Sequence, residues 1–218
     1  MELLRIYKMR KLYYIILFVL YSSSLYSQEN KVGIGVSANV DFIGYNDIVE
    51  LKIESPIVYN FGVLALYNYT DKLFFETGLL YSTYTKKINS ENRMMKFNSD
   101  YMFKLPLNVN YFITNKNNLF VGGGLVFVFK PKHNDLFRIG NNTGSLLIKN
   151  VTSRELFVNY KINSGYFFYF NKSKLMVDLS LNFTTNSMDK NIIDYRDQYF
   201  KYDMNKMYYS LGVKYFFL

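Results

Sequence analysis

The sequence contains no cysteine, no tryptophan, one histidine and three prolines in 218 residues. The absence of cysteine excludes a disulfide framework, a thiolate metal site, a cysteine nucleophile and a lipid anchor on an N-terminal cysteine. The single histidine, His133, excludes a metal site built from several histidines. Half of the residues are apolar, with 22 Tyr and 20 Phe, and this content excludes a disordered chain. The length suits one domain or two small ones.

Residues 1–27 have the order of a secretory signal peptide. Basic residues come first, an unbroken apolar run follows over residues 12–20, and small polar residues precede Gln28. A membrane-anchor helix needs about 20 apolar residues, and this run is far shorter. We therefore expect a cleaved leader, helical over residues 12–24 in the precursor, and a mature domain of residues 28–218. Met9 is an alternative start of the same signal.

The formal net charge is +9, but the basic residues are scattered singly through the sequence. Nucleic-acid binding favours a clustered basic stripe, and an exported chain rarely meets nucleic acid. Anionic lipid headgroups or solvent are therefore the expected surroundings of these charges, and nucleic acid is not an expected partner.

After the leader, the sequence alternates between apolar and polar residues with a period of two, which predicts β-strands. Between Val32 and Phe42 every even position is apolar, and the odd positions after Val32 hold only Gly, Ser, Asn and Asp. In the fifth segment the run Gly122-Gly123-Gly124 leaves the parity open. The eight segments are residues 32–42, 57–69, 73–82, 101–111, 119–130, 156–168, 175–183 and 209–217.

The connections between these segments alternate in length. Short turns follow segments two, four and six, whereas long loops at roughly residues 46–55, 87–99, 131–154 and 186–206 follow segments one, three, five and seven. Short turns at one end and long loops at the other are typical of bacterial outer-membrane barrels. The predicted fold class is therefore all-β, an eight-stranded antiparallel up-and-down transmembrane β-barrel. In hydrocarbon an open sheet edge is costly, so the eighth strand must pair with the first.

A soluble eight-stranded barrel would show the same alternation with its apolar face inward, and this lipocalin-like alternative stays open. We favour apolar side chains outward because seven of the eight apolar faces carry no charged residue, and because aromatic residues lie at the ends of four of the apolar rows. The other face is then mainly Gly, Ser and Asn, in a bore that its own side chains fill, so a wide pore is not expected. The charges on this face predict a balanced lumen network of Asp41, Glu76, Lys104, Lys161, Asp178 and Lys214.

The leader and the whole mature chain resemble the small outer-membrane β-barrel proteins labelled PorT-like, most specifically in two strand segments. Residues 74–81 (FFETGLLY) and 103–112 (FKLPLNVNYF) resemble the third and fourth strands of that family, and Tyr26-Ser27-Gln28 resembles its leader ending. The resemblance implies a Gram-negative cell envelope, and a local kink or bulge at Pro106. Because one member of the family is needed for a secretion system, it also allows an accessory role in such a system.

The last strand also resembles the C-terminal signal that the barrel assembly machinery reads. The matching residues are Ser210, Gly212, Tyr215 and Phe217, although Leu218 follows where many relatives end on the aromatic residue. The resemblance implies that the assembly machinery is a partner during biogenesis.

Candidate catalytic and ligand sites are weak. His133 with Asp135 and Ser145 or Ser153 is a loose hydrolase pattern that lacks a Gly-x-Ser-x-Gly elbow. The three consecutive glycines lack the Lys-Ser/Thr of a phosphate loop and favour a kink that relieves barrel curvature. The loop acids Asp189, Asp194, Asp197 and Asp203 are too widely spaced for a calcium loop. We name no catalytic, cofactor-binding or metal-binding residue and expect no cofactor.

The sequence thus predicts a non-enzymatic integral outer-membrane protein that acts as a scaffold or binds and adheres through its outer loops, with loops 131–154 and 186–206 as the main contact regions. One alternative is an accessory component of a secretion or envelope-assembly system. A second alternative is a lipid-modifying enzyme of the outer membrane. Outer-membrane lipid is the expected partner in each case.

Overall fold

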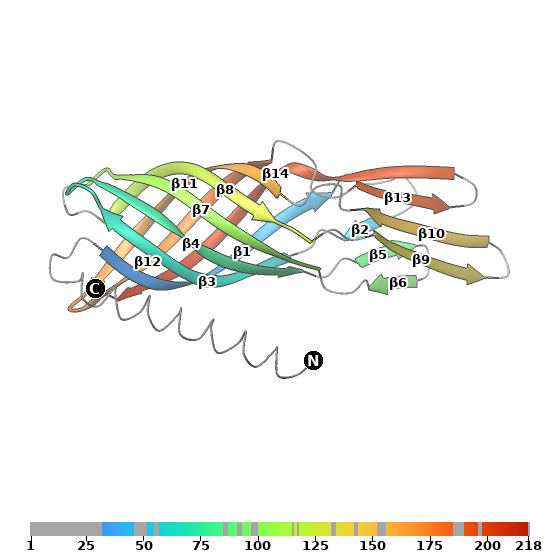
Figure 1. Ribbon diagram of the computed structural model, residues 1–218, viewed down its shortest axis with the longest axis horizontal. Coiled ribbons are helices and arrows are strands. Elements are labelled where there is room, and N and C mark those ends of the chain that lie inside the picture. Colours follow the sequence, from blue (N-terminus) through green and yellow to red (C-terminus); the bar gives the residue numbers. More distant parts are fainter. Residues whose placement is uncertain are drawn as a thin grey trace, which may run out of the picture.

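Eight strands form a closed antiparallel barrel (Figure 1). The computed structural model describes residues 32–45, 52–54, 57–84, 87–90, 93–96, 100–114, 116, 118–131, 134–141, 144–151, 156–184, 190–195 and 198–217. The predicted leader, residues 1–27, lies outside this part of the chain. The barrel strands are β1 (Val32–Tyr45), β3 (Ile57–Asn68), β4 (Leu73–Tyr84), β7 (Asp100–Phe112), β8 (Leu119–Phe129), β11 (Leu156–Phe170), β12 (Ser173–Thr184) and β14 (Gln198–Phe217).

Each barrel strand pairs with the next along the chain, and the last pairs with the first. The β1–β14 ladder runs from Ile34 opposite Phe217 to Tyr45 opposite Met204, with one irregularity after Ile43. This pairing leaves no free edge between the terminal strands, as the sequence predicted. Within the described residues no helix is long and apolar enough to cross a membrane.

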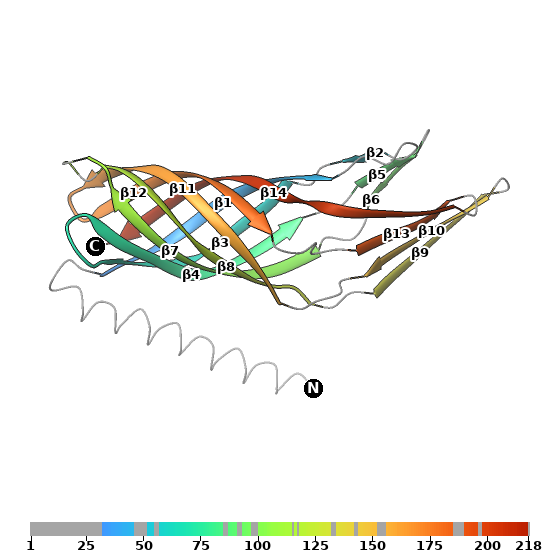
Figure 2. The same cartoon turned by 90° about the horizontal axis from the view of Figure 1, so that it is seen from above.

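The connections expected as long loops contain further strands, which corrects that part of the sequence interpretation. β14 continues for 20 residues, and β13 (Lys190–Tyr195), β10 (Gly144–Val151) and β9 (Asn134–Asn141) pair beside its first half. A second small sheet consists of β2 (Lys52–Glu54), β5 (Lys87–Ser90) and β6 (Arg93–Lys96). Both sheets project beyond the rim at one end (Figures 1 and 2). We call this the loop end and the opposite rim the turn end.

The outward face of the barrel is apolar on every strand. Val36, Phe61 and Leu179 are 50%, 52% and 62% exposed, so the predicted parity is confirmed. In β8 the outward residues are the odd ones, such as Val121 and Phe129, which settles the parity that the three glycines left open. Where the side chains of the eight barrel strands are described, none that points outward is charged.

The lumen is less polar than the sequence analysis expected, because apolar side chains close both of its ends. At the turn end the buried rings pack with centroids 4.7–6.5 Å apart, at tilted or edge-on angles. Such geometry is favourable for aromatic pairs. We call this cluster the aromatic plug: Phe74, Phe112, Phe120, Phe167 and Phe216.

At the loop end a second group of buried side chains lies across the bore. Val58, Val128 and Phe157 are at most 4% exposed, and Lys130 Nζ donates to the Tyr84 hydroxyl at 2.9 Å. Most of the buried polar and charged residues therefore occupy the middle of the lumen, between two tiers of mostly apolar side chains.

Neither Pro106 nor the glycine run shifts the register of its strand. The β4–β7 pairing keeps one register on both sides of Pro106, so no bulge occurs, and only the bridges opposite Gly78 and Leu79 are missing. Proline lacks the N–H that such a bridge needs. Gly122 and Gly124 continue the β7–β8 and β8–β11 ladders and lie under the side chains of Asn110 and Asn108. Their role is to give room to these amides in a narrow bore.

Glycine also gives room to the aromatic plug, and this can be tested at Gly165. A Cβ at this position would collide with the backbone oxygen of Val177 and lie 2.7 Å from two carbons of the Phe120 ring, which is closer than real contacts allow. We expect Gly165→Ala to destabilise the barrel by about 1–3 kcal/mol because it overpacks the plug. Urea unfolding of the protein in detergent measures the change. Ser164→Ala, one residue away on the outward face, is the control and should unfold like the parent.

Candidate functional site

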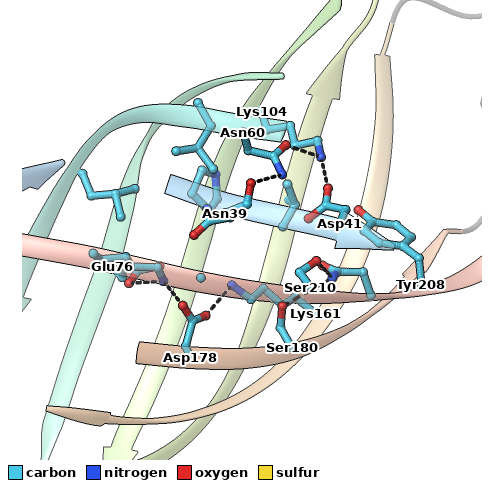
Figure 3. Close-up of a pocket in the computed structure, with 17 residues that line it drawn as sticks. Asn39, Asp41, Asn60, Glu76, Lys104, Lys161, Asp178, Ser180, Tyr208 and Ser210 are labelled. Carbon is cyan, nitrogen blue, oxygen red and sulfur yellow. Dashed lines mark hydrogen bonds and ion pairs between the residues drawn. The ribbon is translucent and has the colours of Figure 1, made fainter. Parts of the chain in front are cut away.

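The middle of the lumen holds six charged side chains, which we call the charged belt. They come from six different strands and surround a central cavity of about 40 Å³, which has room for about three water molecules (Figure 3). Five are buried, and the Lys161 side chain is 11% exposed. The belt consists of Asp41, Glu76, Lys104, Lys161, Asp178 and Lys214.

One part of the belt joins β1 to β7 across the lumen. Lys104 Nζ lies 2.5 Å from Asp41 Oδ2 and donates to Asn60 Oδ1 at 2.8 Å. The Ser82 hydroxyl donates to the same amide oxygen at 2.5 Å. The Tyr208 ring lies 5.9 Å from the Lys104 ammonium, within range of a cation–π contact. The buried ammonium therefore has an anion, an amide and a ring around it.

The other part is a chain of four alternating charges. Lys214 Nζ donates to both carboxylate oxygens of Glu76, at 2.9 and 2.8 Å, and lies 3.3 Å from Asp178 Oδ1 without hydrogen-bond geometry. Lys161 Nζ lies 3.5 Å from Asp178 Oδ2. Asn108 donates a further bond to Glu76 Oε1 at 2.8 Å. Each charge in this chain thus contacts at least one opposite charge.

This arrangement suits internal bracing better than ligand binding. The three carboxylates and three ammonium groups balance, and the cavity between them is small. Removing one partner of a buried ion pair leaves an uncompensated charge, so the pairs constrain the strands that carry them. Among the described residues no group of three or more His, Asp or Glu side chains is placed to hold a metal ion.

The residues of the predicted assembly signal lie on both faces of β14. Ser210 and Gly212 point inward, and a Cβ at position 212 would collide with the side-chain oxygens of Asp178 and Asn39. Tyr215 and Phe217 point outward, and their rings lie edge to face at 5.0 Å. The glycine is thus required by the charged belt itself, and reading of this strand by the assembly machinery stays a prediction.

The weaker sequence candidates do not converge in the described structure. His133, Ser153, Asp189 and Asp197 lie outside the described residues. Asp135 and Ser145 lie on β9 and β10, and Asp194 and Asp203 on β13 and β14, in the sheet beyond the barrel. Sequence reasoning missed the aromatic plug; four of its members, Phe74, Phe112, Phe167 and Phe216, share the inward parity of the charged residues on the same strands.

Comparison with known proteins identifies the fold and no closer relationship. No family model matches the sequence, and no curated protein sequence matches it. The barrel is similar to the crystal structure of the outer membrane protein OprG from Pseudomonas aeruginosa, with a TM-score of 0.53 and 13% identity over 86% of this chain and 95% of OprG. At this identity the similarity shows the fold alone, that of an outer-membrane β-barrel protein.

Two further solved structures are more distant. The toluene transporter TbuX from Ralstonia pickettii has a TM-score of 0.37 at 7% identity, over 86% of this chain and 89% of its own. The outer membrane protease OmpT from Escherichia coli has a TM-score of 0.36 at 9% identity, over 86% of this chain and 95% of its own. Neither activity transfers to this chain at such scores.

The bracing role of the belt predicts the effect of reversing one charge. Lys104→Glu places a carboxylate against Asp41 in a buried site, and we expect a loss of about 3–5 kcal/mol in the free energy of unfolding. Urea titration followed by gel mobility in detergent measures the loss. Exchanging the partners in the double variant Asp41→Lys/Lys104→Glu should recover part of it. If the single variant unfolds like the parent, the pair contributes nothing to stability.

Proposed function

We propose that the chain is an integral protein of the bacterial outer membrane, with its barrel embedded in lipid. The observation that carries this proposal is the outward face of eight strands, which bears apolar side chains and no charged one where it is described. Exposed apolar patches on soluble monomers rarely exceed a few hundred Å². A continuous apolar wall around a closed cylinder therefore suits acyl chains, and disfavours the lipocalin-like alternative.

The function that this barrel supports best is non-enzymatic and lies at its ends rather than in its bore. The aromatic plug and the charged belt fill the lumen in successive tiers, which leaves no wide path for a solute. The two sheets at the loop end extend the chain beyond the rim and offer the larger surface for contacts. We infer a scaffold or a receptor for binding and adhesion through this loop end.

A second candidate is an accessory role in a secretion or envelope-assembly system. The observation that favours it is the PorT-like pattern of residues 74–81 and 103–112, which form parts of the neighbouring strands β4 and β7. Purification of the protein from its native membrane in mild detergent distinguishes the two. A stable stoichiometric partner supports the accessory role, whereas a barrel that purifies alone supports the first proposal.

Membrane insertion predicts that a charged residue introduced on the outward face lowers the free energy of unfolding more near the middle of the bilayer than near its surface. Leu179 and Tyr69 are equally exposed, at 62% and 61%, but Leu179 lies midway along β12 and Tyr69 lies in the turn before β4. We expect Leu179→Arg to cost about 2–4 kcal/mol and Tyr69→Arg about 0–1 kcal/mol in a bilayer. Folding into phosphatidylcholine vesicles, followed by the heat-modifiable gel shift, measures both. Equal costs would contradict embedding, as would recovery of the native protein in the soluble fraction of the cell.

The closed lumen predicts an electrically silent protein. The parent protein, reconstituted in a planar lipid bilayer at neutral pH, should give no steady single-channel conductance, because the aromatic plug leaves ions no hydrated path. A general porin from the same preparation method serves as the positive control for insertion. Reproducible conductance steps from the parent would show that the lumen opens.

A further inference from the structure

The turn-end mouth of the lumen contains a lysine that the bracing network does not use. Lys174 is the second residue of β12 and lies opposite Tyr169 on β11 and Phe216 on β14. Its side chain points inward and the residue is only 4% exposed. The ammonium lies 5.4 Å from the centre of the Phe167 ring, so the aromatic plug forms the floor beneath it.

Unlike the lysines of the charged belt, Lys174 has no anionic partner in the described chain. The ion pairs formed by Lys104, Lys161 and Lys214 all lie deeper in the lumen. A buried ammonium is costly unless an anion or hydrogen bonds compensate it, and one ring face compensates only a part. An anion that reaches Lys174 from the turn end would supply the missing part of this compensation.

The rim around this mouth is basic as well. Each of the three short turns carries a lysine, and Asp71 is their only described acid. Lys116 and Lys172 are exposed, and Lys72 Nζ donates to the Thr114 carbonyl at 2.8 Å, which ties the first turn to the second. Positive charge thus gathers at this end of the barrel around Lys174.

We propose that the turn-end mouth binds the phosphate of an anionic phospholipid headgroup, with Lys174 as the buried contact and Lys116 and Lys172 as outer contacts. Lipid is favoured over free phosphate because large apolar side chains surround the site. Tyr69 and Phe170 at the same rim are 61% and 55% exposed, at a level where acyl chains begin if the barrel is embedded as proposed above. The inference rests on that embedding and adds the class of lipid.

Lipid retention by the purified full-length mature protein tests the site. The protein in a neutral maltoside detergent is titrated with phosphatidylglycerol or with phosphatidylcholine, and native mass spectrometry counts the bound lipids. We expect phosphatidylglycerol to bind at least about fivefold more tightly than phosphatidylcholine, since one lysine near a lipid surface contributes about that factor. Lys174→Met keeps a flexible apolar chain over Phe167 and should abolish the preference. Lys149→Gln on β10, the control, removes one charge at the loop end and should leave the preference for phosphatidylglycerol unchanged.

The outcomes separate this inference from its premise. A Lys174→Met protein that keeps its heat-modifiable shift and still prefers phosphatidylglycerol overturns the site. If the Lys174→Met variant does not fold, the double variant Lys116→Gln/Lys172→Gln is measured instead. An undiminished preference of this double variant for phosphatidylglycerol overturns the proposed site. Displacement of the lipid by millimolar inorganic phosphate overturns the assignment to lipid. If the parent protein itself showed no heat-modifiable gel shift, the proposed embedding in the membrane would instead be refuted.

Discussion

The structure depends on the pairing of β1 with β14, because this ladder turns a sheet with two free edges into a cylinder. Every backbone group of the barrel can then find its partner within the wall, which is the condition for a β-structure to lie in hydrocarbon. Closure of eight strands leaves a bore that side chains must fill. The inward glycines, the amide layer over Gly122 and Gly124, and the aromatic plug are all consequences of that narrowness.

The charged belt stabilises the same β1–β14 pairing from inside the lumen. Asp41 on β1 forms an ion pair with Lys104 on β7. Lys214 on β14 forms one with Glu76 on β4. Each of the two terminal strands is thus linked to a strand elsewhere in the wall. Both ion pairs join strands that have two other strands between them in the wall, so both need the wall to curve round the bore. The ion pairs therefore add long-range specificity to a ladder whose own hydrogen bonds are all local to two strands, and Gly212 leaves the space that this packing needs.

Period-two alternation was enough to predict the eight strands, their order, the outward face and the six inward charges. It could not reveal the aromatic plug, because Phe74 is followed by Phe75, Phe167 by Phe168 and Phe216 by Phe217, so that both faces are aromatic at these places. The strands of the loop end were missed for a related reason. Asn-rich segments such as residues 134–151 resemble loops in composition, and their pairing depends on β14 extending beyond the barrel.

The three tiers of the lumen bear on where such a protein can work. A filled bore transmits no solute, and a balanced belt attracts no ion, so recognition has to occur at the two rims or on the lipid-facing wall. The rims differ in kind. The turn end is compact, basic and built on a rigid floor of packed rings, and its one buried lysine lacks a carboxylate among the described residues. The loop end consists of sheets that continue past the wall. A rigid basic mouth suits a small headgroup, whereas an extended backbone surface suits a large partner, and a sealed cylinder between them keeps the two interactions independent.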